Sequence, residues 1–359
     1  MEKRRLGRTG LMVSPIGCGG IGLRQVDQDT ADEVLNKCLD SGLNLVDTAR
    51  GYRDSESKIG RAIGHRRNEF YLSSKAHDTT RDEMRRDIDT SLKELGVDKI
   101  DIYKCHNLRK MEVYEKIMGP GGAMEALEEA REEGLIDFIG LSSHRFTETM
   151  KRAINSGRFD VIMLVYNILN EELTDEEVIP LAREKDVGVM VMKSLGGGFL
   201  ATPPPEMMLE LEKEKRVHIS ATEALQFVLA NDAVSIAVVG MLRPQEVEEN
   251  VRAAETFAGM SEEEKSRLVE AALALGKGFC RNCGYCLPCP QGIKIPVILR
   301  EFGYFQRYGL KEWAKARYSM VEATAEDCIE CGECEEKCPY DIAIMEQIRE
   351  AHKALSAAD

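Results

Sequence analysis

Short apolar runs alternate with longer amphipathic segments over most of this chain, and this alternation restricts the possible folds more than any other feature. The runs are rich in β-branched and apolar residues, as is typical of strands buried on both faces. Eight candidate strands cover 16–18, 43–47, 70–74, 100–106, 138–142, 161–166, 188–192 and 235–239. Helical patterns, often opened by Asp, Ser or Thr and closed by Gly, cover 30–40, 81–95, 122–133, 176–185 and 221–230.

Eight βα units in about 250 residues are what a closed parallel barrel requires. We therefore predict an α/β fold whose main domain is a (β/α)8 TIM barrel. A doubly wound open sheet is the alternative, although it usually has fewer strands. We expect a hairpin over 4–13 before the first barrel strand. After the last unit, the capping-box pattern Ser261-Glu262-Glu263-Glu264 predicts a helix to about residue 275.

The distribution of the 11 cysteines divides the chain. Cys18, Cys38 and Cys105 are scattered through apolar patterns, where cysteine usually behaves as a small buried hydrophobe. The other eight are packed into two blocks after residue 279, behind the linker-like Gly276-Lys277-Gly278. We predict a barrel domain over 1–278 and a second domain over 279–359. Helical patterns at 295–308, 310–325 and 339–355 indicate that this second domain is mainly helical and held by metal rather than by a large core.

The net charge argues against several classes of partner. The 62 Asp and Glu residues outnumber the 48 Lys and Arg, which gives a net charge of −14. A nucleic-acid-binding role driven by basic charge is disfavoured, as is attachment to an anionic membrane surface. No run approaches the ~20 apolar residues that span a bilayer, and the charged start Met1-Glu2-Lys3-Arg4-Arg5 does not lead into an apolar signal core. We expect a cytoplasmic protein with reduced thiols.

The two cysteine blocks have the spacing of iron–sulfur ligands. The second block follows the bacterial C-x2-C-x2-C-x3-C-P pattern, and the first differs only in a final spacing one residue shorter. The predicted metal ligands are Cys280, Cys283, Cys286 and Cys289 in the first block and Cys328, Cys331, Cys334 and Cys338 in the second. A single zinc ion is more often bound by two C-x-x-C pairs set further apart. The blocks therefore predict two [4Fe–4S] clusters, with two zinc sites as the alternative.

The blocks allow two ways of sharing ligands. In two-cluster ferredoxins the fourth cysteine of each run ligates the other cluster. Carried over to this chain, that rule joins Cys338 to the first three cysteines of the first block, and Cys289 to the first three of the second. Local pairing of each block with its own cluster is the other possibility.

Residues 17–22 fit the dinucleotide-binding pattern G-x-G-x-x-G, but no helix opens inside the motif as that fingerprint requires. Four other stretches carry a more specific signal. They read Asp47-Thr48-Ala49-Arg50-Gly51-Tyr52-Arg53-Asp54-Ser55-Glu56-Ser57-Lys58-Ile59-Gly60, Tyr71-Leu72-Ser73-Ser74-Lys75, Asp101-Ile102-Tyr103-Lys104-Cys105-His106 and Ile139-Gly140-Leu141-Ser142-Ser143-His144. In this order they resemble the aldo/keto reductase family over residues 4–256. With the cysteine blocks, the chain resembles the branch fused to a two-cluster ferredoxin-like iron–sulfur domain.

The resemblance implies a catalytic tetrad of Asp47, Tyr52, Lys75 and His106. The first, third and fourth of these end successive predicted strands, so they reach the C-terminal face where barrel enzymes act. In the family, Tyr52 would protonate the alkoxide while hydride arrives from nicotinamide, and His106 would bind the carbonyl oxygen. An ordinary Tyr has a pKa of about 10, and a neighbouring ammonium from Lys75, held by Asp47, would lower it. Taken singly, each of these side chains also has a structural interpretation, such as capping or core packing.

The resemblance also implies the nucleotide contacts, with departures from the family pattern. Where the family commonly places Ser and Asn after the fifth strand, Gln on the sixth and an aromatic residue at the end of the seventh, this chain has Ser142, Ser143, Met163 and Met192. Further expected contacts are Tyr166, Gly196 in a loop that continues to Pro203-Pro204-Pro205, Gly240, Arg243, Glu246 and Asn250. Glu246 stands where NADPH-selective relatives carry Arg, so NAD(H) is favoured, with Arg243 as a competing phosphate ligand.

Two functions follow from these patterns. The first is a NAD(P)-dependent oxidoreductase that acts on a small carbonyl or alcohol substrate and carries two [4Fe–4S] clusters. The second is an electron-transfer protein in which the barrel is a docking or regulatory scaffold. Hydride carries two electrons, whereas each cluster normally carries one, so a redox partner such as a flavoprotein or a ferredoxin is a possible further partner.

Overall fold

The computed structural model describes residues 1–144, 146–169, 174–198, 200, 219–274, 278 and 280–357. The chain divides into two compact units, Met1–Ser194 with Leu225–Met260 and Leu195–Ala224 with Ser261–Asp359. These units group segments that lie close together, and they do not test whether residues 1–278 fold independently. The predicted domain boundary at residue 278 therefore stays a prediction. Most of the predicted linker and Pro203-Pro204-Pro205 lie outside the described residues. Among the described residues, no helix is long and apolar enough to cross a bilayer.

Eight parallel strands close into a barrel in the order β10-β3-β4-β5-β6-β7-β8-β9. The strands are β3 (Ile16–Gly19), β4 (Leu45–Asp47), β5 (Tyr71–Ala76), β6 (Ile100–Cys105), β7 (Ile136–Ser143), β8 (Val161–Val165), β9 (Gly188–Met192) and β10 (Ile236–Gly240). Every predicted barrel strand is present, with bounds that differ by at most two residues. The TIM-barrel prediction is confirmed, and the open doubly wound sheet is excluded.

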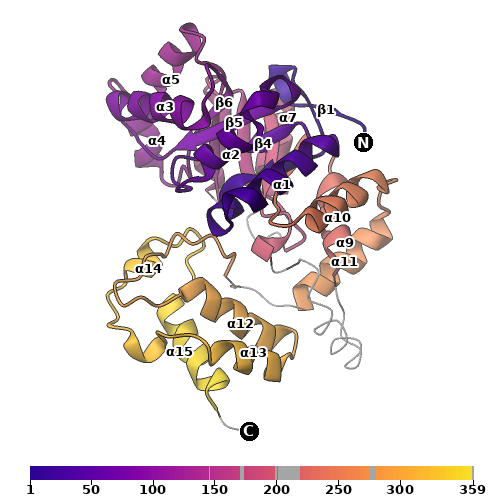
Figure 1. The fold of residues 1–359 in the computed structure, drawn as a ribbon, viewed down its shortest axis with the longest axis vertical. Helices are drawn as coiled ribbons and strands as arrows, with labels where there is room; N and C mark the ends of the chain where they lie inside the picture. The colour runs from indigo at the N-terminus through magenta and orange to yellow at the C-terminus, as the bar shows by residue number, and fades with distance from the viewer. Residues whose placement is uncertain are drawn as a thin grey trace. The chain divides into compact units, whose positions relative to one another are not determined.

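Helices connect the strands and surround the barrel (Figure 1). They are α1 (Gln28–Asp40), α2 (Ser55–Ile63), α3 (Arg81–Leu95), α4 (Met111–Met118), α5 (Ala123–Glu132), α6 (Thr147–Asn155), α7 (Ile179–Glu184), α9 (Ala221–Leu229) and α10 (Pro244–Glu255). The glycine motif leads into the 3-10 turn η2 (Gly20–Gln25), and the first α-helix begins only at Gln28. The pattern predicted as one helix over 176–185 is instead a π-helical turn, η4 (Thr174–Val178), followed by α7, with Pro180 in its first turn.

An N-terminal hairpin covers the end of the barrel where the strands begin. Strands β1 (Arg4–Arg5) and β2 (Met12–Val13) pair antiparallel, as predicted, around the turn η1 (Gly7–Thr9). Leu6 and Val13 are fully buried in the apolar cluster that fills the barrel interior. Because the hairpin occupies this end, the opposite, C-terminal end is left for the functional side chains.

The C-terminal segments form a helical unit with an apolar core of its own. Its elements are α11 (Glu262–Ala274), α12 (Ile295–Arg307), α13 (Lys311–Tyr318), η6 (Ala325–Asp327), α14 (Glu333–Glu336) and α15 (Ile344–Leu355). Helices α12, α13 and α15 lie side by side (Figure 1). Their core includes Ile298, Phe302, Tyr318 and Ile348, which corrects the expectation that metal substitutes for a large core. The Ser261–Glu264 capping box is present at the start of α11.

Two of the predicted C-terminal helices are shorter than expected. The helix predicted over 310–325 ends at Tyr318, and the helix predicted from residue 339 begins at Ile344. The second difference has a local cause, because Asp341 adopts a left-handed conformation (φ 47°) that interrupts any helix opened by Pro339.

Two glycines of the N-terminal hairpin provide a matched test of how the hairpin packs on the barrel. Gly7 and Gly10 both have positive φ, but a Cβ on Gly7 would lie 2.2 Å from the backbone nitrogen of Gly188, whereas a Cβ on Gly10 would meet nothing within 4 Å. We expect Gly10→Ala to lower the free energy of unfolding by about 1 kcal/mol. Gly7→Ala should lower it by a further 1–3 kcal/mol, roughly, because the backbone must shift. Urea unfolding measures both, and equal losses would contradict this packing.

Candidate active site and cluster-binding segments

A buried carboxylate, Asp47, lies at the C-terminal end of β4 and binds two lysines. Lys75 Nζ on β5 donates to Asp47 Oδ2 at 2.5 Å, and Lys104 Nζ on β6 donates to Oδ1 at 2.6 Å. Ser73 Oγ donates to the same Oδ1 at 2.9 Å, and Lys75 also donates to the carbonyl oxygen of Thr48 at 2.7 Å. All three charged side chains are at most 3% exposed.

Sequence reasoning missed Lys104. The available signal was the alternation along β6, because Ile100, Ile102 and Lys104 share one face of the strand and Ile102 belongs to the interior cluster of the barrel. Gly140 on the neighbouring strand β7 makes room for it, since a Cβ there would lie 2.7 Å from Lys104 Cγ.

The pKa shifts of this network follow from burial and from opposite charge. Burial alone would raise the pKa of Asp47, but the ammonium groups of Lys104 and Lys75 outweigh it and hold the pKa below its usual value. Burial lowers the pKa of Lys104 to about 8, even though Asp47 opposes the shift. At neutral pH Asp47 is therefore ionised and Lys104 keeps its proton.

Tyr52 and His106 complete the predicted tetrad. Tyr52 lies in the turn between β4 and α2, and its backbone N–H donates to the carbonyl oxygen of Ala49 at 3.0 Å. Lys75 Nζ lies over the Tyr52 ring, 4.9 Å from the ring centroid. His106 directly follows β6, and its ring meets the Tyr52 ring edge-on at a centroid separation of 5.7 Å. The structure thus brings all four predicted side chains together at one end of the barrel.

Two more imidazoles, which sequence reasoning also missed, lie beside His106. The ring of His77 stacks on the ring of His106 with centroids 3.9 Å apart. His144, directly after β7, is buried. Burial lowers the pKa values of His106 and His144 well below the usual value, helped by neighbouring cationic side chains. His106 is therefore neutral at neutral pH and can hydrogen-bond to a substrate oxygen without bringing a charge.

The predicted nicotinamide contacts occupy buried positions, except Met192, which is partly buried. Ser142 Oγ accepts from the Asn107 N–H at 2.9 Å, and Ser143 Oγ donates to the carbonyl oxygen of Leu108 at 2.6 Å. Met163 belongs to the interior cluster of the barrel, and Met192 packs against that cluster. The ring of Tyr166 lies 5.8 Å from the ring of Phe227, centroid to centroid. Gly196 is buried in the 3-10 turn η5 (Gly196–Gly198).

The residues expected at the nucleotide's adenosine end follow β10, whose last residue is Gly240. Arg243 directly precedes α10, and its guanidinium pairs with Glu246 Oε1 at 2.8 Å. The other carboxylate oxygen of Glu246 accepts from the backbone N–H of Leu242 at 2.7 Å. Asn250 is buried on the same helix. The carboxylate of Glu246 thus binds the backbone just before α10 and pairs with Arg243.

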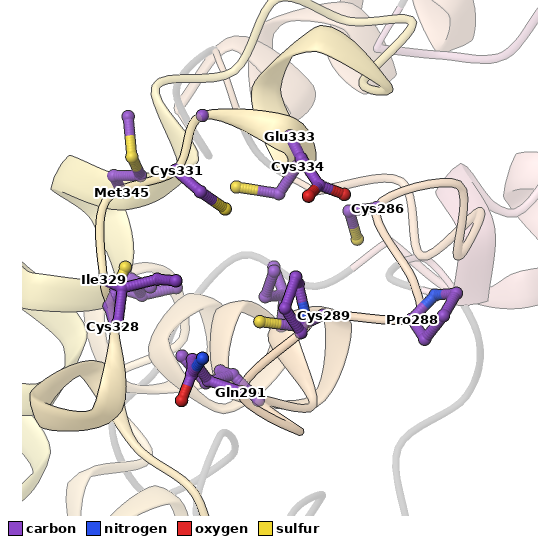
Figure 2. Close-up of a pocket in the computed structure, with 15 residues that line it drawn as sticks. Cys286, Pro288, Cys289, Gln291, Cys328, Ile329, Cys331, Glu333, Cys334 and Met345 are labelled. Atoms are coloured by element: carbon purple, nitrogen blue, oxygen red, sulfur yellow. The ribbon is translucent and has the colours of Figure 1, made fainter.

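The eight clustered cysteines line two hollows. One is lined by Cys280, Cys283, Cys286 and Cys338, with Arg281 and Tyr340 also in its wall. The other is lined by Cys289, Cys328, Cys331 and Cys334, and also by Cys286. Figure 2 shows the side chains of Cys289, Cys331 and Cys334 directed into the second hollow. Four cysteines line the first hollow and five line the second, with Cys286 shared, and a [4Fe–4S] cluster is held by four thiolates.

Comparison with known proteins identifies the class. The family model "Aldo/keto reductase family" matches residues 15–273, and the model "4Fe-4S dicluster domain" matches residues 279–343. This chain belongs to the aldo/keto reductase family and is an oxidoreductase with a C-terminal 4Fe-4S dicluster domain, which confirms both resemblances.

Relatives and solved structures cover the barrel. L-galactose dehydrogenase of Arabidopsis thaliana is 30% identical over 306 residues, which span 76% of this chain and 94% of that protein. The uncharacterized oxidoreductase YqkF of Bacillus subtilis is 26% identical, with 74% and 95% covered. The holo structure of the aldo-keto reductase AKR11C1 from Bacillus halodurans aligns with a TM-score of 0.64 at 27% identity, covering 76% of this chain and 96% of that one.

Proposed function

We propose that this protein catalyses reversible hydride transfer between NAD(P)H and a small carbonyl or alcohol substrate. The observation that carries the proposal is the convergence of Tyr52, Lys75, Asp47 and His106 at the C-terminal end of the barrel. The domain at the C-terminus is proposed to carry two [4Fe–4S] clusters, with a redox partner and a cytoplasmic location as further parts of the hypothesis.

Each member of the tetrad has a role that its position supports. The phenol of Tyr52 gives its proton to the substrate oxygen in reduction and takes it back in oxidation. The ammonium of Lys75, over the Tyr52 ring, stabilises the phenolate, and Asp47 keeps Lys75 charged and oriented. Neutral His106 holds the carbonyl oxygen by a hydrogen bond. Bound NAD(P)H supplies the hydride.

The crossed sharing of cysteines is the ligand assignment that the two hollows support. One cluster would be held by Cys280, Cys283, Cys286 and Cys338, and the other by Cys289, Cys328, Cys331 and Cys334. Cys286 lines both hollows, so its position alone does not assign it to one of the two clusters. Its assignment to the cluster of Cys280, Cys283 and Cys338 follows the two-cluster ferredoxin pattern.

Tyr52→Phe tests the catalytic assignment. Because the change removes the proton donor and little else, carbonyl reduction should fall by about 10²–10⁴ while nucleotide affinity stays unchanged. Steady-state kinetics with NADH or NADPH, together with nucleotide titration, measure both. Tyr103→Phe is the matched control, because it also removes a buried hydroxyl, which contacts Ser91 at 3.0 Å outside the tetrad. Full activity in Tyr52→Phe would show that the tetrad is misassigned.

Iron analysis of double cysteine variants tests the cluster assignment. Anaerobically purified wild-type protein should hold about eight irons per chain, roughly four per cluster. Crossed sharing places Cys283 and Cys338 on one cluster, so the double serine variant should keep about four irons with matching sulfide. Local pairing would remove a ligand from each cluster and leave almost none. Cys38→Ser, at a buried cysteine of α1, is the control. Zinc without sulfide in the wild type would overturn both assignments.

The Arg243–Glu246 pair leads us to expect a preference for NAD(H). The carboxylate of Glu246 repels a 2′-phosphate and occupies Arg243, which could otherwise bind it. Glu246→Gln should therefore tighten NADPH binding more than NADH binding, because it releases Arg243. Fluorescence titration of both nucleotides against both proteins checks this. Wild-type affinity for NADPH at least tenfold above that for NADH, about 1.4 kcal/mol, would refute the preference.

A further inference from the structure

The carboxylate of Asp47 is shared by two lysines, and only Lys75 lies over the Tyr52 ring. Lys104 is fully buried, donates to Asp47 Oδ1 at 2.6 Å and also contacts Ser73 Oγ. If Lys104 were apolar, Asp47 and Lys75 would form a neutral pair beneath Tyr52. With Lys104 present, one negative charge faces two positive charges, and the network keeps a net positive charge in a place that water does not reach.

Other titratable groups lie around the network, and one of them is acidic. Lys104 interacts with Asp47 and Lys75. His106 interacts with both lysines, His77 and His144, while Asp78 acts on His77, and Arg109 and Lys193 act on His144. His106 and His144 are neutral at neutral pH because burial lowers their pKa values. Glu56 contacts Ser74 on the opposite face of β5, where it pairs with Arg50. Among the described residues, Asp47 is the anion that hydrogen-bonds to both lysines of the network.

We propose that Lys104 is a positioning residue that keeps the network beneath Tyr52 positively charged and thereby favours the Tyr52 phenolate, the form required for alcohol oxidation. The inference rests on the proposed function. In that direction the alcohol O–H proton passes to the Tyr52 phenolate oxygen, and the C–H bond breaks with its electron pair going to the nicotinamide of the oxidised nucleotide. The lowered pKa of Lys104, about 8, limits this help to pH values at which Lys104 keeps its proton.

The test compares pH profiles of Lys104→Met and Lys104→Gln with the wild type. In the rate of alcohol oxidation plotted against pH, we expect the rise that follows Tyr52 ionisation to shift to higher pH by about one unit in the variants. The reason is that a positive charge near the phenolate is lost. The KM for nucleotide should not change. Lys58→Met is the matched control, because Lys58 is also buried and donates to the carbonyl oxygens of Leu23 and Val26 on another part of the barrel. Profiles of folded Lys104 variants that superimpose on the wild-type profile would overturn the proposal.

A second measurement needs no turnover and separates this inference from the proposed function. The phenolate absorbance of wild-type protein minus that of Tyr52→Phe, followed against pH, gives the ionisation of Tyr52 directly. We expect Tyr52 to titrate below the ordinary value of about 10, in the pH range where Lys104 keeps its proton, and to titrate higher in the Lys104 variants. If Tyr52 titrates in this way but the protein is inactive on every carbonyl and alcohol tried, the proposed function is refuted and the role of Lys104 is retained. Wild-type titration at or above 10 would overturn that role, even if neither Lys104 variant folds.

Discussion

The buried carboxylate of Asp47, bound on both sides by lysine ammonium groups, is the interaction on which the barrel's functional end depends. Removing one partner of a buried ion pair typically costs about 3–5 kcal/mol, because the remaining charge is left without compensation. The strand register places Asp47 opposite Ser73 and Lys75 opposite Lys104. Two like charges directly opposite each other on neighbouring strands are destabilising unless an anion lies between them. The network therefore constrains the register of β4, β5 and β6, since a slip of one residue would turn these side chains out of the barrel.

The same interior carries the apolar contacts that hold the barrel together. Ile102 lies two residues before Lys104 on the same face, and the fully buried Leu6 and Val13 fill the interior from the hairpin end. An apolar interior lowers the local dielectric and strengthens each charge interaction at the other end.

The barrel strands could be predicted from the sequence, because strands buried on both faces are continuous apolar runs between turn signals. The tetrad was predictable through the resemblance, and its convergence follows from three of its residues ending neighbouring strands. Lys104 was not identified, because a lysine near the end of a strand can also extend into solvent, although it shares a strand face with the buried Ile102. The start of α15 was missed for a different reason. Pro339 is a common first helical residue, but the left-handed backbone of Asp341 depends on how the chain leaves Cys338.

The net charge of the Tyr52 network also bears on which direction of the reaction the protein would favour. In the proposed mechanism, reduction uses a protonated Tyr52 and oxidation uses the phenolate, so a positive charge beside Tyr52 would assist oxidation and weaken the proton donor for reduction. A preference for NAD(H), as the Arg243–Glu246 pair suggests, is consistent with the same direction, because both features suit an enzyme that delivers electrons from an alcohol. Those electrons leave in pairs as hydride, whereas a [4Fe–4S] cluster accepts them singly. Electron transfer between the nucleotide and a cluster would therefore require a carrier that separates the two electrons, such as a flavin. This requirement is the physical reason for including a redox partner in the proposed function.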